Sequence, residues 1–123
     1  MSLSGNDALK LSGAMMLGYG VQTIAIPDDM MKMFFREDEQ PTASPMWSSL
    51  AGAFMLGTGL PMLKLGVDGK ADKGSLLMAT GLMAAGAGHM AVNAKKFKPE
   101  MLAVNAAMVG GVTYLNAMAL KNA

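Results

Sequence analysis

Charged residues in this chain are confined to short segments, and long uncharged stretches separate them. Residues 40–63, 74–94 and 101–120 contain no Asp, Glu, Lys or Arg, and residues 11–26 form a shorter uncharged stretch. A surface helix of a soluble protein carries polar residues along the whole of its exposed face, and these stretches do not. A membrane span needs ~20 predominantly apolar residues, a length that three of the stretches reach outright. The pattern therefore predicts transmembrane helices.

The first stretch reaches a spanning length only if its helix begins near Ala8 and includes Lys10, whose long side chain can extend to the interface. We therefore predict four transmembrane helices, near residues 8–27, 45–63, 74–94 and 101–120. Short polar loops join the last three, so consecutive helices should be antiparallel neighbours. The expected fold class is an all-α integral membrane bundle, with residues 1–123 forming a single membrane domain. The alternative is a soluble helical bundle rich in Ala and Gly, because the mean hydropathy is only +0.32.

The connection after the first helix has two chemically different sides. Its apolar side consists of Met30, Met31, Phe34 and Phe35, and its polar side of Asp28, Asp29, Lys32 and Arg36. This pattern predicts a short amphipathic helix near residues 28–36, started by Pro27 and an Asp cap. Such a helix either lies in the membrane interface or covers the end of the bundle.

Composition excludes several classes of function. Ten basic and nine acidic residues give a net charge of +1, so nothing in the charge balance favours binding to nucleic acid. The chain has no cysteine and one histidine, which excludes disulfides, thiol catalysis and the usual zinc sites. No carboxylate pair or nucleophile–base pair falls within the predicted spans, and we expect a protein that is not an enzyme and holds no metal ion.

Three segments repeat the glycine spacing G-x-x-x-x-G-x-G. They are SGAMMLGYG at 12–20, AGAFMLGTG at 51–59 and TGLMAAGAG at 80–88. A dinucleotide-binding loop has its glycines in the order G-x-G-x-x-G between a strand and a helix, and a P-loop needs a lysine after its last glycine. Neither condition is met, so the repeat does not indicate a phosphate-binding loop.

Close helix packing is the interpretation that fits these glycines. Apolar burial does not drive helices together in lipid, and small residues allow the close backbone approach that association needs. Residues five and seven apart lie about 500° and 700° around a helix, so we expect all three glycines of each copy on one broad side. The predicted packing residues are Gly13, Gly18, Gly20, Gly52, Gly57, Gly59, Gly81, Gly86, Gly88, Gly110 and Gly111. Fifteen methionines would supply flexible filler around them.

His89 is the candidate cofactor-binding residue, and it is expected well inside the third predicted span. A neutral imidazole is an axial ligand for haem iron and for chlorophyll magnesium, and Gly88 beside it would let a flat macrocycle approach. The other interpretation is an interhelical hydrogen bond with Asn93, Asn105 or Asn116. The cofactor itself is unknown; chlorophyll or another pigment and bound lipid are the candidates.

Small loops, no catalytic groups and glycine-rich helices favour a non-catalytic accessory subunit of a larger membrane complex. We expect an energy-transducing assembly, photosynthetic or respiratory, in the thylakoid or mitochondrial inner membrane. Its expected partners are other membrane subunits and the lipid bilayer. The alternative is a small oligomeric channel or carrier for a neutral solute, lined by four polar residues: Gln22, Asn93, Asn105 and Asn116.

Overall fold

The computed structural model describes residues 4–39 and 45–123, and 88% of these residues are helical. Within these ranges there are five α-helices and no strand. The helices are α1 (Gly5–Ala25), α2 (Pro27–Phe34), α3 (Pro45–Val67), α4 (Lys73–Val92) and α5 (Pro99–Lys121), with 3-10 turns η1 (Glu37–Glu39) and η2 (Ala94–Lys96). The predicted all-α fold is therefore confirmed.

Three of these helices are long and apolar enough to cross a membrane. They are residues Met46–Val67 of α3, the whole of α4 and the whole of α5. Their number indicates a multi-pass integral membrane protein. α1 is not among them, because polar residues such as Lys10 and Gln22 lower its mean hydropathy.

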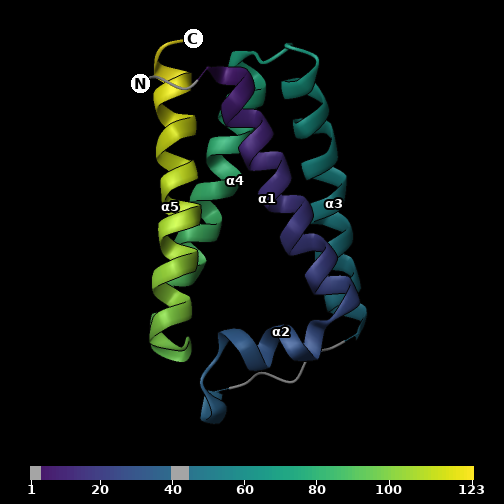
Figure 1. Ribbon diagram of the computed structural model, residues 1–123, viewed down its shortest axis with the longest axis vertical. Helices are drawn as coiled ribbons and strands as arrows, with labels where there is room; N and C mark the ends of the chain where they lie inside the picture. The colour runs from purple at the N-terminus through teal and green to yellow at the C-terminus, as the bar shows by residue number, and fades with distance from the viewer. Residues whose placement is uncertain (1–3, 40–44) are drawn as a thin grey trace.

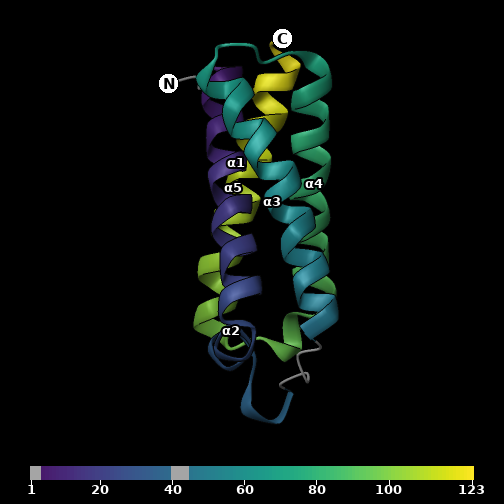
Figure 2. The same cartoon turned by 90° about the vertical axis from the view of Figure 1, so that its right-hand side faces the viewer.

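The four long helices run along the long axis of the molecule, and α2 lies across one end (Figures 1 and 2). The start of α1 and the end of α5 lie at the other end. Consecutive long helices alternate in direction, as predicted, but not all of them are neighbours. α1 packs along α3 and α4 packs along α5, whereas α3 and α4 make little direct contact although only residues 68–72 join them. α1 also contacts α4 and α5, which makes it the central helix.

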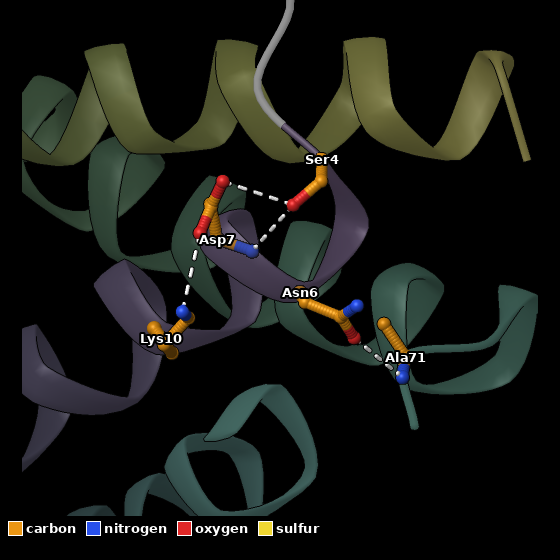
Figure 3. Close-up of polar contacts among 5 residues, drawn as sticks. All are labelled: Ser4, Asn6, Asp7, Lys10 and Ala71. Atoms are coloured by element: carbon orange, nitrogen blue, oxygen red, sulfur yellow. Dashed lines mark hydrogen bonds and ion pairs between the residues drawn. The ribbon is translucent and has the colours of Figure 1, made fainter. Parts of the chain in front are cut away.

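Side-chain hydrogen bonds cap the N-termini of α1 and α4. The Ser4 hydroxyl accepts from the backbone N–H of Asp7, which caps α1, and the Asp72 carboxylate accepts from the backbone N–H of Ser75 at 2.7 Å, which caps α4. The side-chain oxygen of Asn6 accepts from the backbone N–H of Ala71 at 2.9 Å (Figure 3). This last bond attaches the start of α1 to the loop between α3 and α4.

The amphipathic helix α2 turns its apolar side toward the bundle. Met30, Met31, Phe34 and Phe35 are half-buried, whereas Asp28, Asp29, Lys32 and Arg36 are exposed. Pro27 occupies its first turn as predicted, but the expected Asp cap is wrong, because the N-cap position is Ile26 and no side chain caps it. The two-sided pattern is confirmed, and its apolar side covers the end of the bundle.

A short antiparallel bridge fastens this end. Phe35 pairs with Phe97 in the loop between α4 and α5, and the two rings lie 4.6 Å apart between centroids. The N–H of Arg36 donates to the carbonyl of Lys96 at 2.9 Å, and the N–H of Lys98 donates to the carbonyl of Phe34 at 2.9 Å. Segments about sixty residues apart in the sequence are thus held together beneath the bundle.

Candidate functional site

Four of the predicted packing glycines form the closest contact in the molecule, between α1 and α3. A Cβ added at Gly13 would lie 2.6 Å from the backbone nitrogen of Leu63 and 2.7 Å from the carbonyl oxygen of Gly59. A Cβ at Gly59 would lie 3.0 Å from the carbonyl oxygen of Gly13, and Gly20 and Gly52 approach each other in the same reciprocal way. The backbones of the two helices are therefore in contact, and even one methyl group is too large at these positions.

The register of this contact follows from the sequence repeat. Gly13 faces Gly59 and Gly20 faces Gly52, and each pair of glycines in one helix is seven residues apart. Two turns separate residues at that spacing, so they lie on the same side of a helix. The contact extends one step further to Gly66, where a Cβ would lie 2.7 Å from the carbonyl oxygen of Asn6; the sequence-based prediction did not include Gly66.

Six other predicted packing glycines have open space beside them in this chain. No atom of the described residues lies within 4 Å of a Cβ built at Gly18, Gly57, Gly81, Gly88, Gly110 or Gly111. The expectation that all three glycines of a copy share one side is wrong, because residues five apart differ by about 140° in direction. Gly86 is different again: its added Cβ would meet only Val109, at an ordinary 3.6 Å.

In the third copy of the repeat the orientation is reversed. Gly81 and Gly88, which are seven apart like the contacting pairs of α1 and α3, point away from the bundle, while Gly86 points toward α5. The same spacing therefore seats one helix against another in the first two copies and presents an open face in the third.

His89 lies in the last turn of α4, three residues from its end, and its side chain is exposed. The prediction that it lies well inside a span is therefore wrong. Its Nδ1 is 3.4 Å from the side-chain nitrogen of Asn93, one turn further along, and Asn93 donates to the His89 carbonyl at 2.9 Å. The histidine contact is thus within one segment and not between helices.

The interhelical polar contacts are instead made by asparagines of α5 with α1. The Tyr19 hydroxyl donates to the side-chain oxygen of Asn105. Asn116, which is fully buried, donates to the Ser12 hydroxyl at 2.6 Å, and its own oxygen has no partner among the described residues. Sequence reasoning identified both asparagines as intramembrane polar residues but not their partners on α1, because no spacing rule relates residues on different helices.

The four polar residues predicted to line a channel do not share one path. Gln22 and Asn105 border a groove between α1 and α5, whereas Asn116 is sealed in the core and Asn93 ends α4. This arrangement does not favour a continuous polar conduit through the part of the chain that the structure describes.

A cavity of about 230 Å³ lies in the half of the bundle nearer to α2. Residues of α1, α2, α3, α4, α5 and the loop before α5 all contribute to its walls. Five methionines line it: Met15, Met16, Met55, Met83 and Met90. Phe34 and Phe97 belong to its wall at the α2 end, and His89 is at its edge. The cavity is thus almost wholly apolar.

Residues 4–39 and 45–123 contain no cluster of three or more His, Asp or Glu side chains that could hold a metal ion. The two ion pairs among these residues join exposed side chains about one helical turn apart, Lys10 with Asp7 at 3.2 Å and Lys64 with Asp68 at 2.7 Å. The hydrogen bond and the positive charge of Lys64 lower the pKa of Asp68.

Comparison with known proteins adds no family to these observations: no family model, no curated protein and no solved structure matches this chain. The class of protein defined by the fold is a multi-pass helical membrane protein.

Proposed function

We propose that this chain is a non-catalytic subunit of a larger membrane assembly, held there by helices of other subunits. The observation that carries the proposal is the set of outward glycines on the three apolar helices. Gly57 on α3, Gly81 and Gly88 on α4, and Gly110 and Gly111 on α5 have open space beside them. Glycine lowers helix stability by ~1 kcal/mol relative to alanine. This loss is offset where glycine lets the backbone of another helix come close, as it does between α1 and α3.

The test is whether the chain migrates with other subunits. Membranes from the native source, solubilised in a mild detergent and run on a native gel, should show this chain in a large multi-subunit band. Gly57→Leu should release it from that band while the purified subunit keeps its own stability, because a Cβ at this position meets no described residue within 4 Å. Gly59→Leu is the opposite control and should unfold the subunit itself. Migration of the unmodified chain alone or as a small homo-oligomer would contradict the proposal.

Within this proposal α1 is the fourth span. Its 21 residues rise about 1.5 Å each, or roughly 31 Å, which matches the ~30 Å hydrocarbon core. Its lower hydropathy suits a helix that contacts three others, α3, α4 and α5. α2 then lies at the membrane interface, with its charged side toward the headgroups and its apolar side on the bundle.

The proposed assembly is an energy-transducing one, photosynthetic or respiratory, in the thylakoid or the mitochondrial inner membrane. Its support is the combination of missing catalytic groups with one exposed histidine beside an open glycine. The side chain of His89 is exposed, and a Cβ built at the neighbouring Gly88 meets no described residue within 4 Å. Chlorophyll or haem absorbance in the native band that disappears in His89→Leu would support the ligand role, and a colourless band would contradict it.

A further inference from the structure

We infer that the methionine-lined cavity is a binding site for a segment of one hydrocarbon chain, acyl or isoprenoid, drawn from the surrounding membrane. The first ground is its chemistry. Of the residues that line it, only Tyr19, Asn105 and His89 carry polar side-chain groups. Two of these are occupied with other partners: the Tyr19 hydroxyl donates to the Asn105 oxygen, and the Asn105 nitrogen donates to the Met101 carbonyl at 2.8 Å.

These bonds leave water with almost no partners inside the cavity. A buried water needs two to four polar partners, and apolar cavities of about 150 Å³ stay dry and take up apolar molecules. This cavity, at about 230 Å³, is partly open to the outside, but its almost wholly apolar lining offers water equally few partners. An apolar occupant is therefore favoured over solvent.

The second ground is the position of the cavity in the fold. α3 and α4 make little direct contact, yet Met55 of α3 and Leu82 of α4 both line the cavity. The cavity is therefore bordered by the middle of two helices that are apolar enough to cross a membrane. Phe34 and Phe97 line it at the α2 end, where the bridge between Phe35 and Phe97 holds the two segments together. A hydrocarbon chain of the bilayer is therefore an occupant found beside these helices.

The third ground is the methionine content of the walls. Methionine is unbranched, has three rotatable bonds and is used at binding surfaces that adapt to varied apolar partners. Met15, Met16 and Met55 come from the closely packed α1–α3 pair, and Met83 and Met90 come from α4. Flexible side chains from both sides can close around a chain of variable shape, which a wall of rigid β-branched residues could not do.

Gly86 and Gly81 provide a matched pair of variants on one helix. Gly86 lines the cavity, and its added Cβ meets only Val109 at 3.6 Å, so Gly86→Leu would extend into the cavity without a backbone clash. Gly81 has nothing within 4 Å and does not belong to the lining, so Gly81→Leu adds the same side chain on the outside of α4. Both substitutions change helix propensity in the same way.

The experiment uses the full chain in phosphatidylcholine vesicles with a phosphatidylcholine that carries a diazirine near the end of one acyl chain. After irradiation, tandem mass spectrometry locates the label. We expect saturable labelling at Met83 and Met90, lowered at least tenfold in Gly86→Leu and unchanged in Gly81→Leu. Unsaturable labelling of the exposed Met78 and Val92 is the background that any lipid-facing surface gives.

A parallel reaction with a diazirine-bearing farnesyl alcohol distinguishes acyl from isoprenoid chains. The preferred chain should label the cavity residues at the lower probe concentration. Labelling confined to outward residues, or equal cavity labelling in both glycine variants, would overturn the inference. If Gly86→Leu loses its helical circular dichroism, Leu82→Phe takes its place in the labelling experiment, because it narrows the same cavity from the same helix. Neither result depends on whether the chain belongs to a larger assembly.

Discussion

Replacing Gly13 with alanine should separate α1 from α3, whereas the same change at Gly18 should not. Both glycines lie in α1, five residues apart, and both belong to the first copy of the repeat. At Gly13 the new Cβ would lie 2.6 Å from the Leu63 nitrogen, 2.7 Å from the Gly59 oxygen and 2.9 Å from the Leu63 Cα. At Gly18 it would meet nothing within 4 Å. The pair therefore isolates the contact from the change in helix propensity.

The magnitude follows from two opposing effects. Alanine is more favourable than glycine in a helix by ~1 kcal/mol, which is the whole effect expected at Gly18. Carbon atoms pack best about 3.5–4.0 Å apart, so the helices must part by roughly an ångström at Gly13, and overpacking costs about 1–3 kcal/mol. The upper end of this overpacking cost applies at Gly13, because the contacted atoms belong to the backbone and cannot rotate away. The net result is a loss of about 2 kcal/mol at Gly13 and a gain of about 1 kcal/mol at Gly18.

Equilibrium unfolding in mixed micelles, titrated with sodium dodecyl sulfate and followed by circular dichroism, measures this difference. The free energies of unfolding of the two variants should differ by about 3 kcal/mol, which is roughly a hundredfold difference in the unfolding equilibrium constant. Equal midpoints for Gly13→Ala and Gly18→Ala would refute the backbone contact. A larger loss of unfolding free energy in Gly18→Ala than in Gly13→Ala would show that α1 packs against α3 through its other side.

Three further predictions use the same unfolding assay. Phe97→Ala should lower the free energy of unfolding by about 3–5 kcal/mol, because a buried aromatic ring of the α2 end is lost; a change below about 1 kcal/mol would show that this end does not stabilise the bundle. Ser12→Ala removes the acceptor of the buried Asn116 amide and should cost about 1–3 kcal/mol, and an unchanged midpoint would mean that the amide finds another partner. The N–H of Ser75 holds the pKa of Asp72 below its ordinary value of 3.8, so the cap stabilises α4 above that pH and the stabilisation is lost as the pH falls through the lowered pKa. Asp72→Asn should flatten this acid-side loss, and an identical pH dependence in both proteins would contradict it.

Several features of the fold could be predicted from the sequence because they depend on the chain locally. The uncharged stretches located α3, α4 and α5 to within a few residues, since a spanning helix must exclude charges from its length. The predicted end of α3 is residue 63, whereas the helix ends at Val67 and includes Lys64 in its last turn. The alternation of Met and Phe with charged residues after Pro27 correctly predicted α2 and its two sides.

The glycine repeat shows where local reasoning stops. Its spacing indicated close helix packing, and the seven-residue interval between first and third glycines could have identified which of them share a side. The sequence of one helix does not specify which helix it will face. The pairing of Gly13 with Gly59 and the inclusion of Gly66 therefore depend on the packing of α1 along α3, and the outward direction of Gly81 depends on the packing of α4 along α5.

The helices and their apolar character could be predicted from residue type and spacing alone, because both are local properties of the chain. Only the packing of whole helices shows that α1 is the central helix, that Asn105 and Asn116 bond to Tyr19 and Ser12, and that five methionines line one cavity. These features join residues distant in the sequence, and their positions depend on how whole helices pack. The candidate site belongs to this second group, because residues of all five helices line it.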